Sequence, residues 1–140
     1  MTHDYTVIVN SEQIEQLKSF DENGDFLIEV LRDGVTQIDD SLPEMEKYMN
    51  EYDVPKYKSK GHYLKGSTLT LGLPWLAGAC SDANLFEELK TKDGSSTTDV
   101  DATKSMMQKQ LDEIKHRRNE TVKYIVNDLH YEGLRDLIHL

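Results

Sequence analysis

The sequence predicts an all-α protein that closes as an antiparallel helical bundle. Apolar residues recur at spacings of three and four along most of the chain, which is the pattern of helices with one buried face. Only residues 5–9 alternate in the manner of a strand, and they are too few and unpaired to found a sheet. The chain has 140 residues, is 37% hydrophobic and shows no internal repeat. We therefore expect one domain with one core over residues 1–140.

A short helix is expected first. Asn10 or Ser11 can cap it, because a short polar side chain at this position accepts hydrogen bonds from the first free amides. Ile14 and Leu17 are its apolar residues, three apart in the sequence. The polar run 21–25 should then break the helix before the next one begins.

A longer second helix should begin near Phe26. Its apolar residues share one face: Phe26 or Leu27, Val30 or Leu31, Val35, Ile38, Leu42 and Met45. Pro43 lies inside this pattern, and its ring removes a backbone donor and crowds the preceding turn. We expect the helix to bend or weaken there.

A third helical stretch runs from about Pro55 towards Leu89. Pro55 can start it, since proline is tolerated in the first turn. Pro74, shortly after Gly72, should kink the stretch or split it in two. The run 91–99 is rich in Ser, Thr, Gly and Asp and is typical of an exposed loop.

The last long helix is expected from Val100 or Asp101 to about His130. Its apolar residues near one face are Met107, Leu111, Ile114, Val122, Ile125 and Leu129. The charged block 115–118 interrupts that face. An antiparallel four-helix bundle, with the short N-terminal helix added to it, is the natural closure of these segments.

Charge and composition exclude several kinds of partner. The net charge of −10 argues against nucleic acids and anionic membranes, because binding to either needs a basic patch. No stretch approaches the roughly 20 apolar residues of a membrane span. Cys80 has no second cysteine to pair with, and residues 1–10 lack the features of a signal peptide. We expect an intracellular protein, placed in the cytoplasm, with entry into the nucleus left open.

His62 is the centre of the candidate site. At ~100° per residue, Leu64 and Thr68 fall on one side of a helix and His62 falls nearly opposite. Lys65 and Gly66 stand three and four positions further on, so both adjoin the imidazole on the helix surface. A neutral imidazole offers a ring nitrogen as a nucleophile near pH 7, and a nearby ammonium compensates charge on phosphoryl oxygens. This combination indicates phosphoryl transfer.

Gly66 fits that chemistry as an opening. A glycine in mid-helix costs roughly 1 kcal/mol relative to alanine, so it is unfavourable unless something must approach the backbone there. Leu69 and Leu73 are predicted on the same side as His62, which would make that side partly apolar and suited to protein contact.

No metal site is predicted. The other histidines, His3, His116, His130 and His139, show no ligand spacing with one another or with Cys80. These histidines are expected to be ordinary polar residues. Cys80 is expected to be a buried residue that packs in the core.

The run His62–Gly72 resembles the H-x-L-K-G-S-x-x-x-L-G signature of histidine-containing phosphotransfer (HPt) proteins. The chain looks most similar to the stand-alone fungal members, of the osmosensing type. The resemblance extends from about Phe20 to Cys80, and more loosely to the last helix.

The resemblance implies a four-helix bundle of HPt type and a role in a multistep two-component phosphorelay. His62 would accept a phosphoryl group from the receiver-domain aspartate of a hybrid sensor histidine kinase. It would then pass the group to the receiver aspartate of a response regulator, with Lys65 as the electrostatic neighbour and Gly66 as the opening. Such a phosphocarrier is not an ATP-dependent kinase and needs no cofactor of its own, since the Mg²⁺ belongs to the receiver.

The resemblance also implies a docking surface. Receivers dock on an apolar surface beside the histidine, and Ile14, Leu17 and Phe26 are similar by position to that region. Residues 74–75 and the acidic run 84–88 depart from the family pattern. We expect a modest, transient interface and a monomeric chain.

The alternative is a helical adaptor that binds receiver domains without being phosphorylated, as relatives lacking the histidine do. The presence of both His62 and Lys65 argues against this alternative.

Overall fold

The computed structural model describes residues 4–20, 24–80 and 100–138, and it is helical throughout its regular elements. The elements are α1 (Ser11–Lys18), α2 (Asp25–Asn50), α3 (Val54–Thr70), α4 (Pro74–Cys80), α6 (Val100–Asn127) and the 3-10 helix η1 (Glu132–Leu137). These residues contain no strand, so the all-α prediction is confirmed. The expected loop at 91–99 and the acidic run 84–88 lie outside the described residues.

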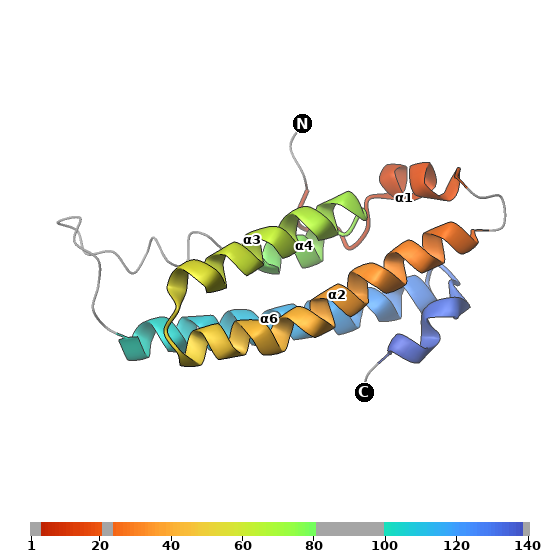
Figure 1. Ribbon diagram of the computed structural model, residues 1–140. Coiled ribbons are helices and arrows are strands. Elements are labelled where there is room, and N and C mark those ends of the chain that lie inside the picture. Colours follow the sequence, from red (N-terminus) through yellow and green to blue (C-terminus); the bar gives the residue numbers. More distant parts are fainter. Residues whose placement is uncertain (1–3, 21–23, 81–99, 139–140) are drawn as a thin grey trace.

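The bundle is built on two long helices. Figure 1 shows α2 and α6 side by side along the length of the bundle. The helices α3 and α4 pack against them, and α1 lies at one end. Along the chain, α2, α3, α4 and α6 alternate in direction, which gives the antiparallel bundle that the sequence predicts. Within the described residues, no helix is both long and apolar enough to cross a membrane.

The starts of α1 and α2 follow their local sequences. Asn10 caps α1, and its side chain accepts a hydrogen bond from the amide of Gln13 at 3.2 Å. Gly24 precedes α2 with a φ of 76°, a left-handed conformation that glycine adopts without steric cost. Of the predicted polar break at 21–25, residues 21–23 lie outside the described part of the chain.

The helix α2 continues through Pro43, which neither ends nor splits it. Pro43 lies on the exposed side, so its ring does not disturb the packed face. The buried apolar residues of α2 are Leu27, Leu31, Val35, Ile38, Leu42, Met45 and Met49, which confirms the predicted face.

The third helical stretch is split into α3 and α4, which is one of the two outcomes predicted from Pro74. The chain turns between them at Gly72. With a φ of 78°, Gly72 ends α3 in a Schellman motif. Its amide donates to the carbonyl of Leu69 at 3.0 Å, and the amide of Leu73 donates to Thr68 at 3.0 Å. Pro74 then starts α4, which packs back against α3.

Close packing between α3 and α4 depends on Gly61. A Cβ atom on Gly61 would lie 2.6 Å from the carbonyl oxygen of Cys80, at the end of α4. The absence of a side chain therefore lets the two helices approach. Cys80 is fully buried, as expected, and burial raises the pKa of its thiol to about 12.

The charged block 115–118 interrupts the apolar face of α6, as expected, and within this block Arg118 is buried on that face. Its side chain is 2% exposed. The guanidinium donates to both carboxylate oxygens of Asp39 at 2.9 and 2.8 Å, and to the carbonyl of Leu137 at 2.5 Å. Arg118 thus joins α6 to α2 and to η1 through a paired, buried charge.

We predict that Asp39→Ala destabilises the fold more than Arg118→Met. Removing the carboxylate leaves a buried guanidinium without its charged partner, which lowers the free energy of unfolding. Because Asp39 is 34% exposed and water can reach the pair, we expect this loss to be only about 2 kcal/mol. Methionine retains most of the aliphatic volume and leaves the carboxylate facing water. Urea denaturation of both variants provides the measurement. A larger loss for Arg118→Met would show that the tie to Leu137 matters more than the charge pair.

Candidate functional site

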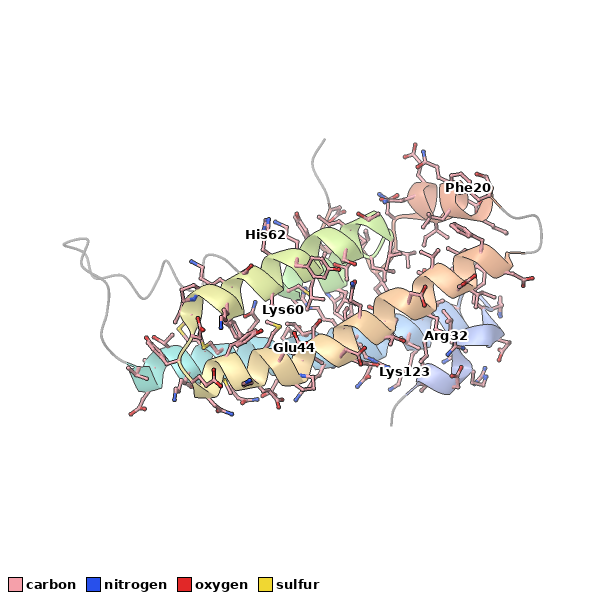
Figure 2. All side chains as sticks on the ribbon, viewed as in Figure 1. Phe20, Arg32, Glu44, Lys60, His62 and Lys123 are labelled. Carbon is pink, nitrogen blue, oxygen red and sulfur yellow. The ribbon has the colours of Figure 1, made fainter. Side chains whose placement is uncertain are left out.

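The two faces of α3 have opposite roles. Its buried residues are Tyr57, Gly61, Leu64 and Thr68, at spacings of four, three and four. His62 lies on the outer face and is exposed, and Figure 2 shows its side chain pointing away from the bundle. Burial of the opposite face fixes the rotation of the helix, so the imidazole is held in solvent where a partner can reach it.

Gly66 leaves open space one turn beyond His62. A Cβ atom built on Gly66 would meet nothing within 4 Å, apart from the backbone of its own helix. Packing therefore does not require glycine at this position, in contrast to Gly61. The mid-helix glycine fits a need for close approach from outside.

Lys65 supplies a cation beside the imidazole. It stands at i+3 from His62 and is half-buried. Its ammonium nitrogen lies over the ring of Tyr5, 5.6 Å from the ring centroid. The helix thus presents a nucleophile, a cation and a gap on one exposed surface.

A groove between α2 and α3 adjoins His62 and Gly66. It has a volume of about 700 Å³. Its lining residues are Val30, Asp33, Gly34, Gln37, His62, Tyr63, Gly66, Ser67, Thr70 and Leu71. The groove opens to solvent on the side where a partner would reach the imidazole.

Gln37 organises one side of this groove. Its amide nitrogen donates to the hydroxyl of Tyr63 at 2.6 Å, and the hydroxyl of Ser67 donates to its amide oxygen at 2.6 Å. Neither Gln37 nor Tyr63 was predicted from the sequence as part of the site. The available signal was the i, i+4 spacing of Tyr63 and Ser67, which places both on the side of α3 that faces α2.

Two of the predicted docking residues are in the core. Ile14 and Leu73 are buried, so neither side chain is available to a partner, and their assignment to a docking surface is corrected here. Leu73 follows the Schellman motif, so it does not continue the outer face of α3 as a single helix would require. Leu17 and Leu69 are partly buried.

Phe26 is accessible, and Phe20 joins it. Phe26 is 39% exposed and Phe20 is 75% exposed. Their ring centroids are 5.7 Å apart with the planes tilted by 60°. Phe26 was predicted from the sequence, whereas Phe20 was not, because it follows α1 and does not lie on the apolar face of that helix. Figure 2 shows Phe20 at the end of α1, on the outside of the molecule.

Other reactive groups do not form a second site in the described residues. Across 4–20, 24–80 and 100–138, no group of three His, Cys, Asp or Glu side chains is arranged to hold a metal ion. The raised pKa of the Cys80 thiol, caused mainly by burial, keeps it protonated and unreactive. His116 is exposed and contacts the edge of Trp75, with ring centroids 6.2 Å apart.

Comparison with known proteins gives two relatives. The phosphorelay intermediate protein YPD1 of Candida albicans is 33% identical over 83 residues, which cover 51% of this chain and 44% of that protein. The multistep phosphorelay regulator 1 of Schizosaccharomyces pombe is 25% identical over 89 residues, which cover 62% of this chain and 30% of that protein. The chain therefore matches less than half the length of either relative. No family model matches the sequence.

An all-α bundle with an exposed histidine on the outer face of α3 agrees with what the resemblance in the sequence implies. The two relatives confirm the resemblance seen in the sequence, and specifically the resemblance to fungal phosphorelay proteins.

We predict opposite effects of alanine at the two glycines of α3. Gly66→Ala should raise the free energy of unfolding by up to about 1 kcal/mol, because it removes the glycine penalty and the new methyl group meets open space. Gly61→Ala, the matched control, should destabilise the protein, because its Cβ would clash with the carbonyl of Cys80. Thermal and urea unfolding of both variants test this. A destabilising Gly66→Ala would mean that Gly66 serves packing.

Proposed function

We propose that this chain is a phosphorelay carrier that accepts a phosphoryl group on His62 and passes it on to an aspartate. One observation carries the proposal: His62 is exposed on a helix whose opposite face is buried, beside a cation and an open glycine. The names of the two relatives, both phosphorelay proteins, support it.

The bonds that form and break in the transfer step belong to the imidazole of His62 and to an activated phosphoryl donor. A lone pair on a ring nitrogen of His62 attacks the phosphorus of an aspartyl phosphate on the partner. The nitrogen–phosphorus bond forms as the bond from phosphorus to the aspartyl oxygen breaks, and the aspartate leaves as a carboxylate. The reverse step returns the phosphoryl group to another aspartate and restores the neutral imidazole.

Lys65 and Gly66 act on different aspects of this step. The Lys65 ammonium compensates the negative charge spread over the three phosphoryl oxygens in the transition state. Gly66 and the adjoining groove leave room for the partner to bring its aspartyl phosphate in line with the ring nitrogen. The chain supplies position and charge, and the partner supplies the activated bond.

The proposed partners are receiver domains, first of a hybrid sensor histidine kinase and then of a response regulator. In this role the chain is a carrier without ATP-dependent kinase activity, and the magnesium ion is expected to accompany the receiver. The adaptor alternative gains no specific support, because an adaptor would require neither the exposed His62 nor the adjacent Lys65.

We predict that three substitutions on α3 separate folding from transfer. His62→Gln should keep the fold, since the side chain is in solvent, and abolish acceptance from an aspartyl-phosphorylated receiver, since an amide is no nucleophile. Lys65→Ala should still accept the phosphoryl group but about 10- to 100-fold more slowly. Gly66→Gln should fold normally and block transfer through its bulk. Thermal unfolding and the rate of label transfer are measured for all three.

Two results would contradict this assignment. Label on the folded His62→Gln variant would place the chemistry at another residue. Unfolding of Gly66→Gln, with normal transfer per folded molecule, would show that the open space beside His62 has no role in approach.

We further predict that Phe20 and Phe26 contribute to receiver binding. A charge placed on either ring position removes exposed aromatic surface, so Phe20→Glu and Phe26→Glu should each weaken binding by about 1–2 kcal/mol. Val100→Glu is the matched control, because Val100 is also 39% exposed but is the first residue of α6, and α6 begins at the end of the bundle away from α1. Calorimetry with a receiver domain measures the affinities. If Val100→Glu weakened binding as much as Phe26→Glu, the effect would be general electrostatic repulsion and not docking.

A further inference from the structure

Residues 4–9, here called the N-terminal strap, cross the turn between α3 and α4 and reach the candidate site through Tyr5. We propose that Tyr5 is a positioning residue whose ring holds the Lys65 ammonium beside His62 without neutralising its charge. This inference rests on the proposed function and concerns how the cation of the site is kept available.

The strap is attached to the bundle by backbone hydrogen bonds. The amide of Asn10 donates to the carbonyl of Gly72 at 2.8 Å, and the amide of Trp75 donates to the carbonyl of Val7 at 3.0 Å. At its other end, the amide and hydroxyl of Thr6 both donate to the carboxylate of Asp4, at 3.0 and 2.5 Å. The bonds between Thr6 and Asp4 close a local turn around Tyr5, and the bond from Trp75 to Val7 joins the chain to the bundle two residues after Tyr5.

The Tyr5 side chain packs against α4 at Gly78. A Cβ atom on Gly78 would lie 3.3 Å from the Cβ of Tyr5 and 3.4 Å from its ring, so Tyr5 packs where Gly78 has no side chain. The path of the strap and the packing against Gly78 together place the Tyr5 ring on the side of α3 that carries Lys65. The ammonium lies 5.6 Å from the ring centroid, within the ~6 Å at which a cation is attracted to an aromatic face.

Other lysines of α3 show what distinguishes this pair. Lys60 lies 5.8 Å from the ring of Tyr63, but it also forms an ion pair with Glu44 at 2.8 Å. Lys56, 5.9 Å from the ring of Tyr48, has Asp53 at 3.6 Å. Both of these ammonium groups have a carboxylate partner that reduces the charge available to another anion.

Lys65 is held differently. In the described part of the chain it forms no ion pair, and its ammonium lies over the ring of Tyr5 instead. A ring attracts the ammonium but carries no net charge, so the full positive charge stays available to a phosphoryl group. A free lysine side chain samples many rotamers, and the ring restricts them to the region next to His62. An exposed contact of this kind is weak enough to yield when a dianionic phosphoryl group arrives.

The test uses the full chain and compares Tyr5→Leu with Tyr5→Phe, which keeps the aromatic face. Phosphoramidate serves as the donor, because a small molecule reports on the site without receiver docking. Its phosphorus–nitrogen bond breaks as the bond to the His62 ring nitrogen forms, and ammonia leaves. We expect Tyr5→Leu to slow phosphorylation about threefold, Tyr5→Phe to leave the rate unchanged, and Tyr5→Leu to have no effect when Lys65→Ala is also present. Tyr48→Leu is the matched control and should not change the rate.

A second measurement observes the contact itself. In the wild-type chain, the ring current of Tyr5 should shift the Lys65 methylene protons nearest the ammonium upfield in the NMR spectrum. The shift should persist in Tyr5→Phe and disappear in Tyr5→Leu.

Three results would overturn the proposal: no upfield shift in the wild type, acceleration by Tyr5→Leu, or equal slowing in the Lys65→Ala background. If the shift is present but the wild-type chain accepts no phosphoryl group, the proposed function fails, while the contact between Tyr5 and Lys65 stands.

Discussion

The site depends on one constraint: α3 is packed against the core on one face and presents His62 and Gly66 to solvent on the other. The packed face is fixed by buried Leu64 and Thr68, and by Gly61, which admits the Cys80 carbonyl. Because a helix is rigid, fixing one face also fixes the direction of every side chain on the other. The exposure of His62 is therefore a result of core packing, and the neighbouring Gly66 can remain unfilled because nothing packs against it.

Charge is treated in two ways in this bundle. Arg118 is buried, so its guanidinium is matched by the carboxylate of Asp39 and ties α6 to α2. Lys65 is at the surface, where it contacts a neutral ring instead of a carboxylate. The first arrangement stabilises the fold by satisfying a charge, whereas the second leaves a charge unsatisfied at the place where a phosphoryl group would add negative charge.

Much of the fold could be predicted from the sequence, because the helices of a small bundle are set by local periodicity and capping. The face of α2, the cap at Asn10 and the exposure of His62 needed no tertiary information. What failed depended on contacts between elements. Ile14 has the same spacing whether it faces a partner or α2, and only packing places it in the core. The burial of Arg118 could not be predicted from the sequence either, because its partner Asp39 is distant along the chain.

In the proposed function, the lysine and the open glycine beside His62, and not exposure alone, determine which histidine carries the phosphoryl group. His116 and His130 are also exposed imidazoles, but neither adjoins a lysine and an open glycine on one helix face. The most direct measurement is tandem mass spectrometry of the chain after incubation with an aspartyl-phosphorylated receiver, under conditions that preserve acid-labile phosphohistidine. We expect a phosphoryl group on His62 and on neither His116 nor His130. Equal modification of His116 or His130, or an unmodified chain, would contradict it.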